Sequence, residues 1–473
     1  MLFSSSTFIY LFLPAVLIAY YAIFKNYRTL SNIFLFAASI LFYGWGEPKF
    51  VFVMLVSIVV NWFFGLMVHR AKERSNRTMA MLIIAATCLF DLGLLFVFKY
   101  LNFAESVFCS LLGISPRIKE IVLPIGISFF TFQAMSYVLD VYRGRGQVQK
   151  NILNVGLYIA FFPQLIAGPI VRYETVALEI NSRKESFDDF FNGFARFVVG
   201  LSKKILLANA FGIIADKVFD MSFAGDTISV GTAWLGALAY TFQIFFDFSG
   251  YSDMAIGLGR MFGFHFLENF DYPYISASVT EFWRRWHMSL GSWFRDYVYI
   301  PLGGSRVGKK RLVFNLFVVW FLTGFWHGAD WSFILWGLMY FVLLSFEKLI
   351  GLNKHNSGIS QIFGRVYTLF FVIIGWVLFR SVNTSSAIRY MACMFGVGNT
   401  FSDGFFVGYI RQYAVMLVLG VVCSIPLFKY LWAKIPKNIF TDILHIVCLT
   451  GLFVLCISSM VSSSYNPFIY FNF

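Results

Sequence analysis

Long apolar stretches recur along almost the whole chain and predict transmembrane helices. A helix needs about 20 mostly apolar residues to cross the hydrocarbon core of a bilayer. Stretches of this kind, some of them shorter, lie at residues 8–24, 31–43, 50–68, 79–98, 121–141, 152–171, 230–262, 313–330, 331–350, 362–380, 411–428 and 439–461. The pattern predicts an all-α, polytopic integral membrane protein. No Gly/Ser/Pro-rich linker interrupts it, so residues 1–473 are expected to form one domain.

Basic loops between the apolar stretches set the expected orientation. Cytoplasmic loops of membrane proteins carry an excess of Lys and Arg, and loops 69–77, 305–311 and 429–437 are the basic ones here. Counting crossings from these loops places both chain ends outside and makes the number of crossings even. The first stretch has positive charges after it and none before it, the reverse of a signal peptide, so we expect it to remain as a helix.

Four segments depart from uniform apolarity. Residues 187–208 and 279–299 mix charged and aromatic side chains and predict amphipathic helices in the cytoplasmic interface. Residues 123–126 and 161–169 contain Pro and Gly in apolar surroundings. A helix can break at membrane depth only where the backbone is buried in protein or lines a wet cavity. A central, partly hydrated core is therefore expected.

The composition excludes a soluble globule and a disordered chain. Hydrophobic residues make up 59% of the chain and charged residues 13%, whereas soluble domains are about 45–50% apolar. The net charge of +13 would suggest nucleic acid in a soluble protein, but the basic residues stand in short loops, where membrane orientation and anionic lipid explain them. Neither nucleic acid nor a metal is expected as a partner, and the six Cys lack metal or disulfide spacing.

One histidine lies deep in a predicted membrane helix. His327 follows Arg311 by about 16 residues, which at about 1.5 Å per residue places it about 24 Å from that basic loop. Gly324 and Gly328 leave room beside it for a substrate or another backbone. A buried, neutral imidazole can remove a proton from a hydroxyl or a thiol as a general base. The alternative is a packing histidine that is hydrogen-bonded to a neighbour.

A second histidine, His287, lies inside the amphipathic segment. Arg284 and Arg285 beside it suit the phosphate groups of a donor, and Trp283 and Trp286 suit stacking on a base. The same tryptophans equally suit anchoring of the helix at lipid headgroups. The residues alone leave a donor-binding face and a membrane anchor open.

Polar side chains interrupt the apolar stretch 230–262, and three of them are candidates for a polar core. Gln243 and Asp247 share one helical face, and Asp253 lies on a second polar patch of the same stretch. A buried carboxyl needs a partner. These residues are expected to form a structural polar core that holds neighbouring groups in place, and are less suited to react themselves.

Several of these stretches closely resemble the membrane-bound O-acyltransferase (MBOAT) family. They are residues 247–257, 269–274, 283–304 and 326–329. Within the family the chain is most similar to bacterial alginate O-acetyltransferases and their peptidoglycan-modifying relatives, a branch that residues 42–49 and 465–471 also resemble. The resemblance covers nearly the whole chain.

The resemblance implies a ring of tilted helices around a central tunnel, which joins a cytoplasmic donor entrance to an external acceptor funnel. It implies that His327 is the catalytic histidine and His287 a second functional histidine on the donor side. The implied donor is acetyl-coenzyme A, with no resident cofactor. The implied acceptor is an extracytoplasmic polysaccharide, reached through an extracytoplasmic partner acyltransferase of the SGNH type. The implied location of this chain is the bacterial cytoplasmic (inner) membrane.

Two other functions remain compatible with the residues. A transporter or flippase would also show broken helices and buried acids, although inspection finds no internal repeats of the kind expected of a carrier. The same chemistry with a lipid or D-alanyl group is the other possibility. The sequence does not identify the acceptor polymer, the partner or the oligomeric state.

The end of the chain is aromatic and uncharged. Residues 465–473 are expected outside and resemble the C-terminal motif of the small protein that accompanies D-alanyl transferases. A tyrosine hydroxyl, with a pKa near 10, becomes a nucleophile only beside a base. Tyr470 is therefore expected to carry the acetyl group transiently or to dock the partner, and the alternative is an interfacial aromatic anchor.

Overall fold

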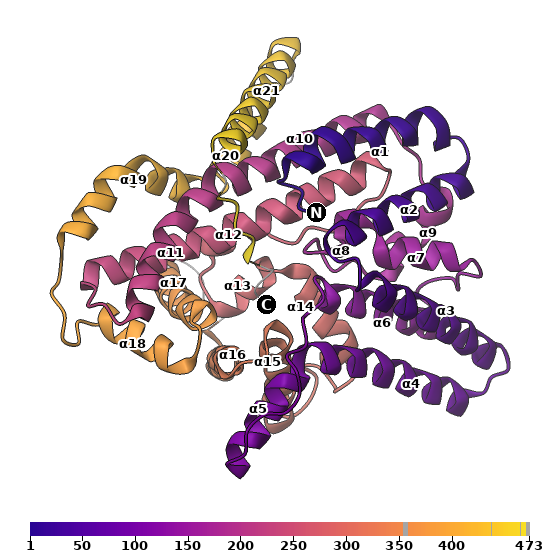
Figure 1. Cartoon of the computed structure of the whole chain (residues 1–473), viewed down its shortest axis with the longest axis horizontal. Coiled ribbons are helices and arrows are strands. Elements are labelled where there is room, and N and C mark those ends of the chain that lie inside the picture. The colour runs from indigo at the N-terminus through magenta and orange to yellow at the C-terminus, as the bar shows by residue number, and fades with distance from the viewer. Residues whose placement is uncertain (353–357, 437, 464, 470–473) are drawn as a thin grey trace. The chain divides into compact units, whose positions relative to one another are not determined.

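The protein is helical throughout the part of the chain that the structure describes. The computed structural model describes residues 1–352, 358–436, 438–463 and 465–469, and these form helices joined by loops, with no strand among them (Figure 1). Packing divides the chain into two compact units, Met1–Phe197 with Tyr251–Leu267 and Val198–Gly250 with Glu268–Phe473. The single domain expected from the sequence stays a prediction. Two helices, α10 and α12, run from one unit into the other.

The first unit is built from the N-terminal helices. They are η1 (Phe8–Phe12), α1 (Leu13–Ala19), η2 (Tyr20–Phe24), α2 (Arg28–Gly46), α3 (Val51–Glu73), α4 (Arg77–Leu95), η3 (Phe96–Tyr100), α5 (Leu101–Leu112), α6 (Ile127–Arg143), α7 (Ile152–Ala160), α8 (Phe162–Leu165), α9 (Tyr173–Ser182) and most of α10 (Phe187–Ser202). Helix α6 packs against α3 and α4 and is buried along most of its length (Figure 1). It therefore forms the centre of this unit.

The second unit contains both histidines named above. Its helices are η4 (Lys203–Ala208), α11 (Asn209–Ala224), most of α12 (Val230–Met261), η5 (Pro273–Ile275), α13 (Val279–Arg285), α14 (Met288–Phe294), η6 (Arg295–Tyr299), α15 (Lys309–His327), α16 (Trp331–Ile350), α17 (Ile359–Arg380), α18 (Thr384–Met394), α19 (Gly404–Cys423), α20 (Leu427–Lys434) and α21 (Ile439–Ser462). Its core is a cluster of buried aromatic and aliphatic side chains from α11, α12, α13, α15, α16 and α17.

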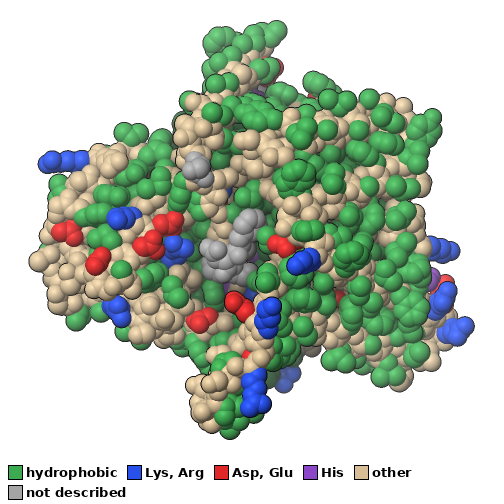
Figure 2. All heavy atoms as spheres, viewed as in Figure 1, with side chains coloured by type: hydrophobic (Ala, Val, Ile, Leu, Met, Phe, Trp, Pro, Cys, Tyr) green, Lys and Arg blue, Asp and Glu red, His purple; other side chains and the backbone are tan. Residues whose placement is uncertain are grey.

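Many of the described helices suit a bilayer. Eight helical stretches are long and apolar enough to cross a membrane. They are Arg28–Gly46, Val51–Glu73, Arg77–Leu112, Phe187–Ala224, Trp331–Ile350, Ile359–Arg380, Gly404–Cys423 and Ile439–Ser462. Hydrophobic side chains cover most of the face shown in Figure 2, and charged ones occupy a few positions. The prediction of an all-α, polytopic membrane protein is confirmed.

Both predicted helix breaks occur, and they meet. The stretch 152–171 is split at Phe161 into α7 and α8, and a non-helical segment precedes α6 at Gly126. Gly126 has a φ of 77°, and a β-carbon there would lie 2.8 Å from the carbonyl oxygen of Leu165. Only glycine allows this approach of two backbones without strain. The broken backbone is thus buried in protein, as the membrane requires.

The two predicted amphipathic helices differ from expectation. The helix expected to end at residue 208 continues through η4 and α11 to Ala224. The helix expected over 279–299 is interrupted at Trp286 and His287, which separate α13 from α14. A single interfacial helix at 279–299 is therefore wrong.

Candidate active site

His327 is the last residue of α15 and lies at a tight crossing of two helices. A β-carbon at Gly324 would lie 2.4 Å from the carbonyl oxygen of Phe333, and one at Gly337 would lie 2.4 Å from that of Trp320. Helices α15 and α16 therefore touch backbone to backbone. A β-carbon at Gly328 would collide with the ring of Phe333. Another backbone therefore approaches closely at Gly324, whereas at Gly328 the neighbour is the side chain of Phe333.

The imidazole of His327 is enclosed by aromatic rings. The side chain is buried, and its ring centre lies 5.0 Å from that of Trp336, 5.2 Å from Phe379 and 4.9 Å from Trp326, with the rings close to perpendicular. Such edge-to-face contacts fix the ring plane. The histidine is therefore held in an orientation instead of rotating in solvent.

The aromatic wall extends from His327 to α13. The ring centre of Trp283 lies 4.8 Å from Trp320, 4.9 Å from Tyr340 and 5.4 Å from Trp336. Trp336 also contacts His327, as described above. One packed cluster thus connects the predicted donor-side tryptophan to the predicted catalytic histidine.

His287 occupies the break between α13 and α14. Its φ is 45°, a left-handed conformation that is uncommon for a residue other than glycine. The side chain is 2% exposed, and Nδ1 lies 3.2 Å from Oδ1 of Asn269. Burial lowers the pKa of His287 to about 3, so its imidazole is neutral at neutral pH.

Asn269 organises this break and was not predicted as a site residue. Its Oδ1 accepts hydrogen bonds from the amide N–H of Ser289, at 3.1 Å, and from the Ser289 hydroxyl, at 2.8 Å. The amide N–H of Met288 donates to the carbonyl oxygen of Asn269 at 3.0 Å. Asn269 thus holds the start of α14 and the ring of His287 together. The only sequence signal was its place in the family-like stretch 269–274.

The two histidines lie one aromatic side chain apart. The ring centre of Trp326 is 4.9 Å from His327 and 6.0 Å from His287. Phe248 of α12 contacts His287 edge to face at 4.7 Å. The structure therefore brings both predicted histidines into one buried neighbourhood of the second unit.

The predicted donor-binding residues on α13 have different environments. Arg284 is exposed. Arg285 forms ion pairs with Glu281, at 3.0 Å, and Asp271, at 3.2 Å. Trp286 is 3% exposed and packs at 4.7 Å from Trp376. The ring of Trp286 therefore lies inside the protein, so both expectations are wrong for it: the ring neither anchors the helix at lipid headgroups nor offers a face for stacking on a base.

The two predicted structural acids both have cationic partners. Asp247 and Lys204 lie 2.7 Å apart, and each side chain is 2% exposed. In the first unit, Asp253 pairs with Arg196 at 2.8 Å. Gln243 packs where a β-carbon at Gly212 would lie 2.9 Å from its Nε2 atom. None of these three contacts involves either histidine.

The Lys204–Asp247 pair also holds the end of the chain. The amide N–H of Ile469 donates to Oδ2 of Asp247 at 3.0 Å, and Nζ of Lys204 donates to the carbonyl oxygen of Pro467. The hydroxyl of Tyr465 donates to Asp216 at 2.5 Å. Phe468 and Ile469 are each 5% exposed. Residues 465–469 therefore insert into the second unit, while Tyr470 lies outside the described residues.

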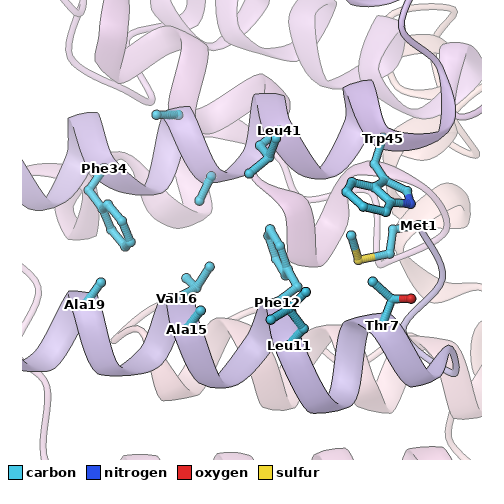
Figure 3. A pocket seen from close by; sticks show the side chains of 12 residues that line it. Met1, Thr7, Leu11, Phe12, Ala15, Val16, Ala19, Phe34, Leu41 and Trp45 are labelled. Carbon is cyan, nitrogen blue, oxygen red and sulfur yellow. The ribbon is translucent and has the colours of Figure 1, made fainter.

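A separate apolar cavity lies in the first unit. It has a volume of about 500 Å³ and lies between the helical run 8–24 and α2, with Phe12, Val16, Phe34 and Trp45 among its lining side chains (Figure 3). The lining contains no titratable side chain. Apart from the hydroxyl of Thr7 its lining side chains are apolar, and no histidine or acid is among them.

Comparison with known proteins links the chain to a family of enzymes. A family model described as MBOAT, membrane-bound O-acyltransferase family, matches residues 147–387, which include both histidines. A probable alginate O-acetylase AlgI from Pseudomonas putida is 37% identical over 495 aligned residues, covering 100% of both chains. The corresponding protein of Pseudomonas syringae pv. tomato is 43% identical over 84% of this chain and 76% of its own length. A peptidoglycan O-acetyltransferase from Helicobacter pylori is 32% identical over 84% of this chain and 80% of its own.

Proposed function

Because this chain belongs to the membrane-bound O-acyltransferase family, we propose that it transfers an acetyl group from cytoplasmic acetyl-coenzyme A towards an extracytoplasmic polysaccharide. The named relatives support the acetyl group and the acceptor class, since they are alginate and peptidoglycan O-acetylases. The observation that carries the proposal is structural. His327 and His287 lie in one buried aromatic neighbourhood, inside the region that matches the family.

The proposed reaction needs an oriented imidazole that can accept a proton, and the aromatic contacts of His327 supply the orientation. His327 removes the proton of an acceptor hydroxyl, and the hydroxyl oxygen attacks the carbonyl carbon of the thioester. The new carbon–oxygen bond forms, the carbon–sulfur bond breaks, and the proton on His327 passes to the departing thiolate of coenzyme A. Burial excludes water, which would otherwise hydrolyse the thioester. His287 and the basic residues Arg284 and Arg285 serve the donor side in this proposal.

The end of the chain supplies the proposed route to the acceptor. Tyr470 receives the acetyl group and passes it to a partner acyltransferase of the SGNH type, or docks that partner. Support comes from residues 465–469, which are tied to Lys204, Asp247 and Asp216 in the unit that holds both histidines. The proposed setting is the bacterial cytoplasmic membrane, consistent with the multi-pass helices.

The central test is acetyl transfer by purified protein with radiolabelled acetyl-coenzyme A, an acceptor polysaccharide and a candidate partner. We expect His327→Ala to lower the transfer rate by at least about 100-fold, the typical contribution of a general base. His69→Ala, on α3, is the matched control and should keep the wild-type rate. Wild-type turnover by the His327→Ala protein would reject His327 as the base.

A second substitution tests the carrier role of Tyr470. Tyr470→Phe removes only the hydroxyl and keeps the ring. We expect release of free coenzyme A and transfer to the polysaccharide both to be lost, because no hydroxyl remains at position 470 to accept the acetyl group. Tyr10→Phe, at an exposed position on η1, is the control. Full export of acetyl groups by the Tyr470→Phe protein would favour the aromatic anchor.

A further inference from the structure

The first turn of α13 is held by a carboxylate from a distant part of the chain. Glu347, near the end of α16, is fully buried. One of its oxygens accepts the amide N–H of Val279 at 2.6 Å. The other accepts the amide N–H of Thr280 at 2.8 Å and the Thr280 hydroxyl at 2.6 Å.

These bonds satisfy groups that a helix leaves open. The first N–H groups of a helix have no partner within the helix, and the N-terminus carries a partial positive charge. A buried carboxylate is costly unless it is hydrogen-bonded or paired. The open N–H groups of α13 and the buried carboxylate of Glu347 satisfy each other, because three donors of α13 point at this carboxylate. Loss of the Glu347 carboxylate would remove the hydrogen-bond acceptor of these buried donors, which costs free energy of folding.

A second contact lies further along the same two helices. Trp283 of α13 packs at 4.9 Å from Tyr340 and 5.4 Å from Trp336, which precede Glu347 on α16 by about two and three turns. Helix α13 is therefore attached to α16 at its start through Glu347 and near its end through Trp283. His287 follows directly after this helix.

Helix α16 is in turn fixed to His327. It begins at Trp331, shortly after His327, and touches α15 backbone to backbone at Gly324 and Gly337. Glu347 lies about 24 Å from the start of α16, at about 1.5 Å per residue. It is too remote to touch the atoms that react near His327, so any effect on catalysis passes through the position of α13.

We propose that Glu347 is a positioning residue, which clamps α13 to α16 and so sets the place of His287 and Trp283 relative to His327. The catalytic part of this inference rests on the proposed acyltransferase function. The clamp itself does not, because it is a set of hydrogen bonds within the second unit. Neither the motifs nor the apolar pattern of the sequence singled out Glu347.

The test measures the clamp and catalysis separately. Glu347→Gln keeps the size of the side chain and removes its charge and one acceptor. We expect hydrogen exchange at the amides of Val279 and Thr280 to accelerate at least tenfold. We expect kcat for acetyl transfer to fall by about 10- to 100-fold, the size associated with small displacements in an active site. The shape of the pH–rate profile should not change, since the base is untouched.

Two further variants make the result specific. Thr280→Val removes one of the three hydrogen bonds and should give a smaller change in the same direction, which keeps the test available if Glu347→Gln does not fold. Glu120→Gln, at an exposed loop position, is the control and should leave both measurements unchanged.

The outcomes separate the two proposals. Unchanged exchange at Val279 and Thr280 in Glu347→Gln would overturn the clamp. Faster exchange with an unchanged kcat would overturn the positioning role, and a shifted pH profile would indicate direct participation in proton transfer. If the wild-type protein transfers no acetyl group, the proposed function fails, while hydrogen exchange still decides whether the clamp exists.

Discussion

At the scale of single residues, the dense packing around His327 leads us to expect a small acyl group as the substrate. Three aromatic rings, those of Trp326, Trp336 and Phe379, stand within about 5 Å of the imidazole centre. Phe333 fills the space beside Gly328 and contacts Phe379 at 5.1 Å. Interiors of this density respond to single methylene groups. We therefore expect an acyl chain longer than acetyl to require displacement of one of these rings.

The size limit can be tested at Phe379. Phe379→Ala removes a ring that is 3% exposed and lies next to His327. We expect the ratio of butyryl to acetyl transfer to rise by at least about tenfold. The reason is that the space left by the ring admits about two additional methylene groups of a butyryl chain. Stability should fall by about 3–5 kcal/mol, as for other buried Phe→Ala changes. Thermal unfolding and transfer from a series of acyl-coenzyme A donors measure the two effects. Phe370→Ala, 37% exposed on the same helix, is the control, and an unchanged acyl preference in Phe379→Ala would contradict the size limit.

At the scale of elements, the sequence predicts regular helices better than the break that carries His287. Helix α16 occupies the predicted stretch 331–350, because its apolar pattern is continuous and Asp330 caps its start. The breaks at Gly126 and Phe161 were predicted because Pro and Gly stand beside them. The break at His287 has neither residue. It depends on Asn269, which is 18 residues away and becomes a neighbour only after folding.

The same reasoning explains which site residues the sequence missed. His327 was found because a histidine in an apolar helix is rare and costly. Glu347 stands beside Lys348 near the end of the apolar stretch 331–350, where charged residues commonly mark a helix end, and Asn269 follows Glu268 in a short polar segment. Their roles arise from contacts with α13 and α14. Spacing rules describe neighbours on one helix. They carry no information about which distant helix end a carboxylate or an amide will meet.

The break itself predicts a measurable role for Asn269. Asn269→Ala removes the acceptor for the Ser289 amide, the Ser289 hydroxyl and the ring of His287. Because His287 then loses its fixed position, we expect kcat to fall by about 10- to 100-fold. Asn269→Asp keeps the accepting oxygen and should retain more activity at a pH where His287 stays neutral. Asn192→Ala, at an exposed position on α10, controls for loss of an amide. Equal activity of the Ala and Asp variants would mean that this oxygen does not position His287.

At the scale of the whole molecule, two sets of buried polar groups join distant parts of the chain. Glu347 joins α16 to α13, and Asp247 with Lys204 joins α12 and η4 to residues 467–469. Buried charges of this kind contribute little net stability but cost much when only one partner is removed. They therefore select one arrangement of the helices over others that would bury the same apolar surface.

The ion pair at the chain end gives the corresponding prediction. Lys204→Met leaves Asp247 buried without its cation, so we expect a loss of about 3–5 kcal/mol of stability. Asp247→Asn should cost a comparable amount, because it leaves Lys204 without its carboxylate. The double variant should be less destabilised than the sum of the two single variants, since no unpaired charge remains.

Both single variants should also expose residues 465–469 to protease, because the same two side chains hold the backbone at Pro467 and Ile469. Thermal unfolding of the purified protein and proteolysis of a tag placed after residue 473 measure the two effects. Additive losses, or a chain end that stays protected in both single variants, would show that the aromatic side chains at 468 and 469 hold this segment without the ion pair.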